Sequence, residues 1–131
     1  MKFVIITLLA VSGILLPPVE QAPIALDDVC RAIGGGNVEE LAAAMDAEVE
    51  LSILDREDIY SRDQAKAALV KFFADYPPSN FGKVHQGASK SDDAEYCIGT
   101  LNTSKGALRV YIYVAKRNDG ILLQELRFDR N

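Results

Sequence analysis

Apolar residues recur at helical spacing through the first part of the chain. The spacing i, i+3, i+4 and i+7 of one group predicts an amphipathic helix, whose buried positions are Leu26, Val29, Cys30 and Ile33. Three glycines at 34–36 end this helix. Asn37, followed three residues later by Glu40, is typical of a capping box and predicts the start of a second helix. The apolar positions of that second helix are Val38, Leu41, Ala42 and Met45.

A short alternating segment and a third helix follow. Val49, Leu51 and Ile53 alternate with polar residues, which predicts a half-buried strand. The charged run at 55–58 predicts a turn, after which residues 59–60 pair back briefly. Ser61 and Gln64 form a second capping box. The helix that it starts carries the apolar stripe Ala65, Leu69, Phe72, Phe73 and Tyr76, and the prolines at 77 and 78 end it.

From Phe81 onward the pattern changes to four strand segments separated by turn signals at 91–93, 104–106 and 118–120. Regular spacing of this kind predicts an antiparallel meander. Two of the turns place glycine third, as a three-residue hairpin loop requires. The sequence therefore predicts one α+β domain in which three helices pack on an antiparallel sheet.

The side chains that each loop length would place opposite one another indicate the length of the loop at 118–120. A three-residue loop sets Val110, Ile112 and Val114 opposite Phe128, Leu126 and Gln124, so that one side of the hairpin is nearly all apolar. The other side then pairs Arg109, Tyr111 and Tyr113 with Asp129, Arg127 and Glu125. A two-residue turn at 119–120 would instead place Val114 opposite Glu125, so we favour the three-residue loop.

Loop length also decides which side of the sheet Cys97 faces, and so whether Cys97 can meet Cys30. A three-residue loop at 104–106 puts Cys97 on the polar side of the sheet, away from Cys30. A four-residue loop that starts at Thr103 reverses this placement and allows a disulfide. The residues alone leave both alternatives open, a disulfide and two buried free thiols.

The first residues have the pattern of an export signal. Met1 and Lys2 form a short positive region, and residues 3–16 form an apolar run that is shorter than a membrane span. The prolines at 17 and 18 end that run. We expect a signal peptide at 1–22, cleaved after Ala22, and a mature domain at 23–131 that is periplasmic or secreted, without a stable membrane span.

Charge and composition narrow the range of partners and cofactors. The 131 residues include 14 basic and 19 acidic residues, for a net charge of −5, and the two signs are interspersed without a basic stripe. This composition argues against nucleic acid as a partner. His85 is the one histidine in the sequence, which excludes a histidine-rich metal site, and no motif indicates a cofactor.

Four stretches carry a resemblance to a known family. VELSILDREDIYSRDQA, KVHQGASK, IGTLNTSKGALRVYIYV and LLQELRFDR resemble the exported Bacteroidetes proteins called domain of unknown function 4783, over about residues 24–130. The order of the elements is similar to the nuclear transport factor 2-like fold (cystatin-like α+β), a cone of curved sheet wrapped around helices. The resemblance implies that fold, self-association through the sheet and a pocket at the open end of the cone. It implies no activity.

Two classes of function follow. We expect a non-enzymatic binding domain that forms a homodimer through the polar sheet face, with the interface candidates Arg109, Tyr111, Tyr113, Glu125 and Arg127. A small apolar ligand in the cone is compatible with this. The alternative is a small enzyme in which Asp55 orients His85 as an acid–base pair, with Tyr60 or Tyr96 donating to an oxyanion.

Overall fold

The computed structural model describes residues 13, 23–89 and 93–131. Its helices are α1 (Leu26–Gly34), α2 (Val38–Ala44) and α3 (Arg62–Asp75). Its strands are β1 (Met45–Ile53), β2 (Arg56–Ser61), β3 (Pro78–Ser89), β4 (Ala94–Thr103), β5 (Gly106–Arg117) and β6 (Gly120–Arg130). The expected signal peptide at 1–22 lies outside the described residues except for Gly13, and so do residues 91 and 92 of the first expected meander turn.

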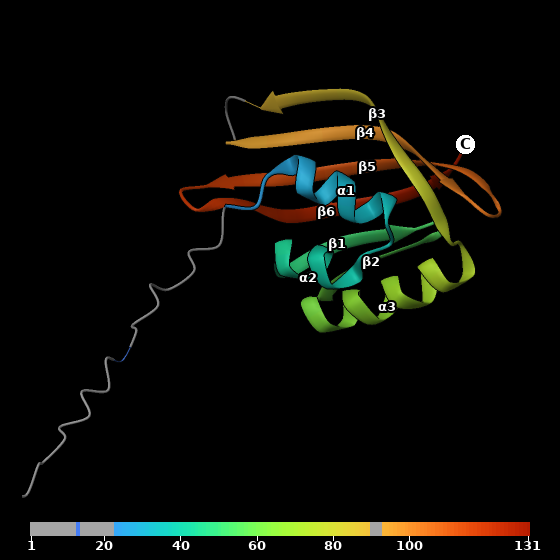
Figure 1. Cartoon of the computed structure of the whole chain (residues 1–131), viewed down its shortest axis with the longest axis horizontal. Helices are drawn as coiled ribbons and strands as arrows, with labels where there is room; N and C mark the ends of the chain where they lie inside the picture. Colours follow the sequence, from blue (N-terminus) through green and yellow to red (C-terminus); the bar gives the residue numbers. More distant parts are fainter. Residues whose placement is uncertain (1–12, 14–22, 90–92) are drawn as a thin grey trace, which may run out of the picture.

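The six described strands form one curved sheet in the order β2-β1-β6-β5-β4-β3. Neighbouring strands are antiparallel except β1 and β6, which are parallel, so the expectation of an antiparallel sheet is wrong for this one pair. Figure 1 shows α1 lying over one face of the sheet, nearly along the strands, and α3 running beside β1 and β2. The α+β class and the meander from β3 to β6 are confirmed.

The helix starts predicted from capping residues are present. The Asn37 side chain accepts a hydrogen bond from the Glu40 backbone N–H at 3.2 Å and begins α2. At α3, the Ser61 hydroxyl and the Gln64 side chain satisfy each other's backbone N–H groups, which completes the predicted capping box. These contacts join residues three positions apart, which is why the sequence alone reveals them.

Met45 is not part of the second helix, so that expectation is wrong. Its backbone is extended, with φ −72° and ψ 144°, and it begins β1 beside Leu123 of β6. Met45 is fully buried in this position. Pairing with β6 therefore takes the residue out of the helix that its local spacing favours.

The β1–β2 hairpin is longer than expected, and its turn is tighter. β2 pairs with β1 along its whole length, from Ile53 opposite Arg56 to Glu48 opposite Ser61. Only Leu54 and Asp55 form the turn, and Leu54 has a left-handed backbone with φ +56°. A left-handed conformation is unfavourable for a residue with a branched side chain.

The β5–β6 register agrees with the prediction over most of its length. Val110 and Ile112 lie opposite Phe128 and Leu126 as expected. Val114, however, lies opposite Leu123, because a bulge between Tyr113 and Val114 shifts the register. The loop has two residues, since Arg117 pairs with Gly120, so the expected three-residue loop is wrong.

The β4–β5 turn also has two residues, because Thr103 pairs with Gly106. The Thr103 hydroxyl donates to the Gly106 carbonyl at 2.7 Å and accepts the Lys105 backbone N–H at 3.1 Å, which closes the tight turn. Cys97 therefore lies opposite Ile112 on the buried side of the sheet. The register of the three-residue loop is wrong, and that of the four-residue alternative is present.

The core fills the space between the helices and the sheet. Phe128 of β6 is fully buried, and its ring lies 4.6 Å from that of Phe72 and 6.0 Å from that of Phe73, both on α3. Val110, Ile112 and Leu126 are fully buried on the same side of the sheet. The apolar side predicted for the last hairpin is therefore the inner side, and the polar side is left uncovered.

Candidate interaction surface

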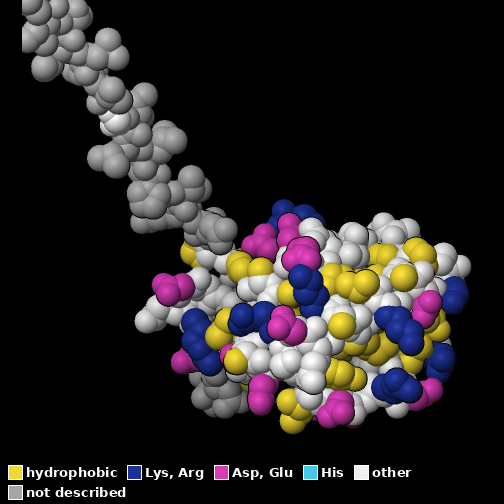
Figure 2. Space-filling model, turned by 90° about the horizontal axis from the view of Figure 1, so that it is seen from below, with side chains coloured by type: hydrophobic (Ala, Val, Ile, Leu, Met, Phe, Trp, Pro, Cys, Tyr) yellow, Lys and Arg dark blue, Asp and Glu magenta, His cyan; other side chains and the backbone are white. Residues whose placement is uncertain are grey.

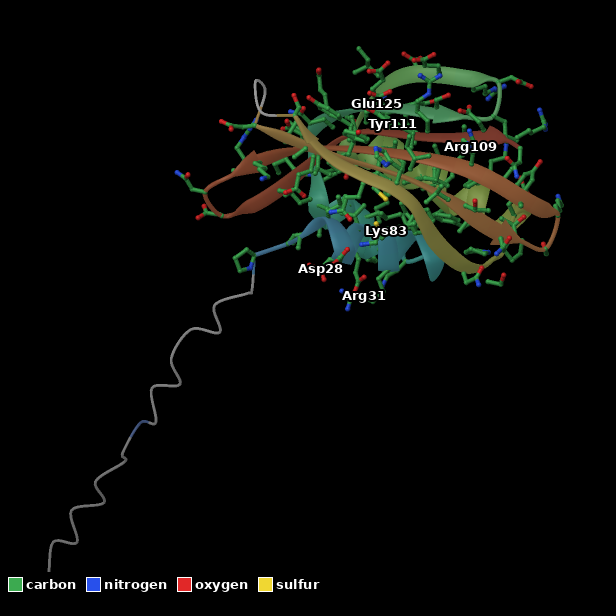
Figure 3. All side chains as sticks on the ribbon, turned by 90° about the horizontal axis from the view of Figure 1, so that it is seen from above. Asp28, Arg31, Lys83, Arg109, Tyr111 and Glu125 are labelled. Atoms are coloured by element: carbon green, nitrogen blue, oxygen red, sulfur yellow. The ribbon has the colours of Figure 1, made fainter. Side chains whose placement is uncertain are left out.

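The side of the sheet that faces away from the helices carries aromatic and charged side chains. Strand pairing sets Tyr111 beside Arg127, Tyr113 beside Glu125 and Arg109 beside Asp129, as the sequence predicted. We call this surface the outer face, and its residues are Tyr96, Ile98, Arg109, Tyr111, Tyr113, Glu125, Arg127 and Asp129. Figure 3 shows Arg109, Tyr111 and Glu125 on the opposite side of the sheet from Asp28 and Arg31 of α1.

A row of rings crosses the outer face from β5 to β3. The rings of Tyr111 and Tyr96 are stacked, with 6.5 Å between their centroids, and His85 Nε2 lies 2.9 Å from the Tyr96 hydroxyl oxygen. Gly87 makes room for this row, because a Cβ on it would lie 2.5 Å from the Tyr96 ring. The tyrosines are half-buried without any cover from the helices.

Arg127 is the electrostatic centre of the outer face. Its Nη1 lies 3.8 Å from the Glu125 carboxylate, which is a long ion pair. Its Nε is buried and, among the described residues, is the one buried side-chain nitrogen or oxygen without a hydrogen-bond partner. Buried N–H groups in native proteins nearly always have an acceptor, so the outer face lacks one.

Acidic groups gather on one flank of the outer face. A hydrogen bond with Glu57 and the nearby charge of Glu125 raise the pKa of Glu50. Burial and the Glu125 charge likewise raise the pKa of the Tyr111 hydroxyl. The outer face thus has a carboxylate flank beside the arginines.

A shallow hollow of about 370 Å³ lies on the outer face. Ile98 and Tyr111 supply its apolar floor, and the charged residues around it are Arg109, Glu125, Arg127 and Asp129. A hollow with two guanidinium groups, two carboxylates and an aromatic ring can receive side chains of either charge. Of the interface candidates from the sequence, Arg109, Tyr111, Glu125 and Arg127 meet in this hollow, and Tyr113 lies beside Tyr96 on the same face.

The acid–base pair considered for an enzyme is not formed. His85 is on β3, and Asp55 is in the turn after β1, so four strand intervals, about 19 Å, separate them along the sheet. Asp55 accepts a hydrogen bond from Arg130 at 3.1 Å, and His85 is exposed and bonded to Tyr96. Tyr60 lies near Asp55, and Tyr96 lies near His85, so the four candidates form two separate groups.

The family resemblance implied a pocket, but sequence reasoning did not identify most of the residues that line the larger pocket of the structure. It lies between α3, the β1–β2 hairpin and the end of β6, and Asp55 and Tyr60 belong to it. The residues that it adds include Lys71, Asp75 and Arg130, which come from segments far apart in the chain. Their side chains carry no local signal, because only the folded sheet brings the C-terminus beside α3.

The two cysteines are neighbours in the core. The sulfur atoms of Cys30 and Cys97 lie 3.9 Å apart, and both residues are present as free thiols. Burial raises the pKa of the Cys30 thiol to about 12, and burial also raises that of Cys97. Thiols whose pKa is raised in this way are poor nucleophiles at neutral pH.

Metal-binding clusters and membrane-spanning helices are both absent from the described part of the chain. Within residues 13, 23–89 and 93–131, no group of three or more His, Cys, Asp or Glu side chains is arranged to hold a metal ion. No helix in the same ranges has the length and hydropathy needed to span a bilayer.

Known families and structures share this architecture. The family model of a domain of unknown function, DUF4783, matches residues 26–129. The chain is similar to a DUF4783 family protein from Bacteroides ovatus, with 30% identity and a TM-score of 0.75 over 85% of this chain and 98% of that one. A DUF4783 family protein from Bacteroides fragilis shows 29% identity and a TM-score of 0.72 over 79% of this chain and 96% of that one.

A more distant structure shows the fold alone. The protein "Rd1NTF2_04 with long sheet" has 16% identity and a TM-score of 0.63 over 78% of this chain and 94% of that one. This likeness agrees with the nuclear transport factor 2-like architecture expected from the order of the elements. No curated protein matches the chain.

Proposed function

The chain belongs to the DUF4783 family, whose members are domains of unknown function, and we propose that it is an exported, non-enzymatic binding domain. In this proposal, two copies of the chain pair through the outer face. The proposal of export rests on Lys2 and the apolar run at 3–16. N-terminal sequencing of the protein recovered from the envelope and cytoplasmic fractions of its own cells tests this part. A mature chain that begins at residue 23 supports it, and an uncleaved cytoplasmic chain contradicts it.

The observation that carries self-association is the unpartnered Nε of Arg127. Leaving a buried donor without an acceptor costs about 1–3 kcal/mol. Arg127 lies opposite Tyr111 of β5, and its Nη1 lies 3.8 Å from the Glu125 carboxylate on its own strand. Nε has almost no accessible surface in the single chain, so contact with a second copy must first turn the partly exposed Arg127 side chain. A carboxylate or carbonyl of that copy then supplies the missing acceptor and removes the cost.

The charges on the outer face are self-complementary. In a twofold symmetric dimer the same surface lies on both sides of the interface, so each group meets the groups of the same face in its partner. Arg109 and Arg127 are positive, while Glu125, Asp129 and Glu50 are negative, and all lie on β1, β5 and β6. A rotation that brings the arginines of one copy over the carboxylates of the other pairs both signs.

The aromatic residues favour the same conclusion. Tyrosine and arginine are enriched at the centres of protein interfaces. Tyr96, Tyr111 and Tyr113 form a half-buried cluster that presents apolar ring surface as well as hydroxyl groups. A binding role is favoured over an enzymatic one because His85 and Asp55 hold separate partners.

A pair of matched variants tests the proposal. Tyr111→Glu adds a charge to the centre of the outer face, and Val70→Glu adds the same charge to an exposed apolar site on α3, where 54% of the residue is accessible. By light scattering after size exclusion, we expect the mature chain 23–131 and its Val70→Glu variant to have twice the single-chain mass and the Tyr111→Glu variant to have the single-chain mass. A native chain that stays monomeric, or a dimer that Val70→Glu disrupts and Tyr111→Glu does not, contradicts the proposal.

A further inference from the structure

The pocket between α3, the β1–β2 hairpin and the end of β6 lies outside the outer face and has a volume of about 540 Å³. We call it the mouth pocket, and its lining comes from Ile53, Leu54, Asp55, Arg56, Tyr60, Ala68, Lys71, Phe72, Asp75, Tyr76 and Arg130. Figure 1 places the ends of α3 and β6 at the right of the molecule. Figure 2 shows hydrophobic surface between Lys and Arg side chains toward that end. The volume is in the range of small-molecule sites.

The floor of the mouth pocket is apolar and aromatic. The rings of Phe72 and Tyr76 stack at 5.2 Å, and Phe72 also contacts the buried Phe128, so the floor is fixed to the core. Ile53 and Tyr60 line it from the hairpin, and both are half-buried. Such a floor binds the apolar body of a ligand by removing its surface from water.

The backbone at the edge of the pocket is unusual. Leu54 has a φ of +56°, a conformation that costs a residue with a Cβ about 1–2 kcal/mol. This conformation forms the tight turn whose Leu54 side chain lines the pocket. Backbone strain of this kind often occurs where a chain shapes a binding site.

The rim of the pocket has an excess of positive charge. Arg130 is paired with Asp55 at 3.1 Å, so these two charges largely cancel. Arg56 and Lys71 have no ion pair among the described residues, and they face one acid on the rim, Asp75. The whole chain has a net charge of −5, so a locally positive rim is opposite in sign to the rest of the protein.

We propose that the mouth pocket binds a small amphipathic carboxylate. The apolar body lies on Phe72, Tyr76 and Tyr60, and the carboxylate lies at the rim between Arg56 and Lys71. This ligand differs from the small apolar molecule expected in the cone, because the rim of the pocket is charged.

Octanoate, octanol and octylammonium test the proposal, because they share one apolar chain and differ in the charge of the head group. Binding is followed on the isotope-labelled full chain by the shifts of its backbone amide resonances. We expect octanoate to bind saturably, with the largest shifts at residues 53–60, in the second half of α3 and at Arg130, and octylammonium to bind at least tenfold more weakly. Equal binding of the two ions, absence of octanoate binding, or shifts confined to other surfaces overturns the proposal.

A double variant assigns the charge selectivity to the rim. Arg56→Gln with Lys71→Gln removes both unpaired cations of the rim. The control Lys66→Gln removes one cation from α3, the helix of Lys71, at a site where Lys66 pairs with Glu39 outside the pocket. We expect the double variant to lose about tenfold in affinity for octanoate and to keep its affinity for octanol, while Lys66→Gln changes neither. The amide spectrum reports folding in each case. Loss of octanol binding by a folded double variant, or an equal effect of Lys66→Gln, overturns the assignment.

Discussion

Oxidation of the cysteine pair is expected to stabilise the domain. Cys30 on α1 and Cys97 on β4 are 67 positions apart in the sequence, and their sulfur atoms lie 3.9 Å apart. A small rotation of the two side chains brings sulfur atoms at that distance to the roughly 2 Å of a disulfide. A mild oxidant should therefore form an intramolecular bond in the folded protein.

The size of the effect follows from the loop that the bond closes. Closing a loop of 67 positions removes chain entropy from the unfolded state worth about 4 kcal/mol at 25 °C. A domain of about 100 residues shifts its melting temperature by about 4 °C per kcal/mol, so we expect an increase of about 15 °C. Strain in the closed bond reduces this value, because the two sulfur atoms must approach within a packed core.

The assay compares thermal unfolding of the oxidised and reduced protein by circular dichroism, with free thiols counted under denaturing conditions. Because the pKa of Cys30 is about 12, we expect the oxidation rate to rise with pH through the alkaline range. The control Cys97→Ala should melt at the same temperature with and without oxidant. A native protein that keeps both thiols under prolonged oxidation, or whose disulfide leaves the melting temperature unchanged, refutes this reasoning.

Three further predictions concern the core, the sheet and the carboxylate flank. Phe128→Ala should lower the free energy of unfolding in denaturant titrations by about 3–5 kcal/mol, because the ring is fully buried, whereas Val84→Ala, at a site that is 73% exposed, should change it little. Gly99→Ala should cost about 1–3 kcal/mol, since its Cβ would lie 2.6 Å from the Gly82 backbone oxygen, and Gly82→Ala, which meets nothing within 4 Å, is the control. The pKa of Glu50 is raised in the folded protein, so ionisation of Glu50 destabilises the fold as the pH rises through that pKa. Glu50→Gln should therefore increase the free energy of unfolding at neutral pH. This increase should vanish below about pH 4, where Glu50 is protonated in both the folded and the unfolded state. A Phe128→Ala variant as stable as the native chain would contradict the first prediction, and equal effects of the two glycine substitutions would contradict the second. An equal effect of Glu50→Gln at neutral pH and below about pH 4 would contradict the third.

Local contacts explain which parts of the fold the sequence predicted. The capping residues Asn37 and Ser61 act on backbone groups three positions away, and the alternation of Val110 and Ile112 requires only a sheet with one buried side. The family resemblance extended this to the whole architecture. The resemblance to this family was confirmed by the match of the DUF4783 family model over residues 26–129.

The wrong loop prediction at 118–120 reflects a contact between distant segments. Ile24 forms an isolated bridge with Gly120, and its carbonyl accepts the Ile121 backbone N–H at 3.1 Å. This contact holds the start of β6 in the register of a two-residue loop, and the bulge after Tyr113 restores the expected pairing further along. No pattern within the hairpin reveals an acceptor almost one hundred positions away.

The candidate surfaces divide in the same way. The outer face follows from alternation along β5 and β6, so Arg109, Tyr111 and Arg127 were found from the sequence. The mouth pocket collects side chains from α3, a hairpin turn and the C-terminus, and the pairing of Arg130 with Asp55 depends on the parallel contact of β1 with β6. A parallel pair joins strands far apart in the chain, and its register has no local turn to fix it.

Isotope-filtered nuclear Overhauser effects in an equimolar mixture of labelled and unlabelled chains test the outer-face dimer most directly. The signals from one copy to the other identify the residues in contact, whatever the total mass. We predict intermolecular effects that involve the rings of Tyr96, Tyr111 and Tyr113 and none that involve α3. Intermolecular effects from α3 alone would contradict the account. So would a concentrated sample that shows no intermolecular effects and has the mass of a single mature chain.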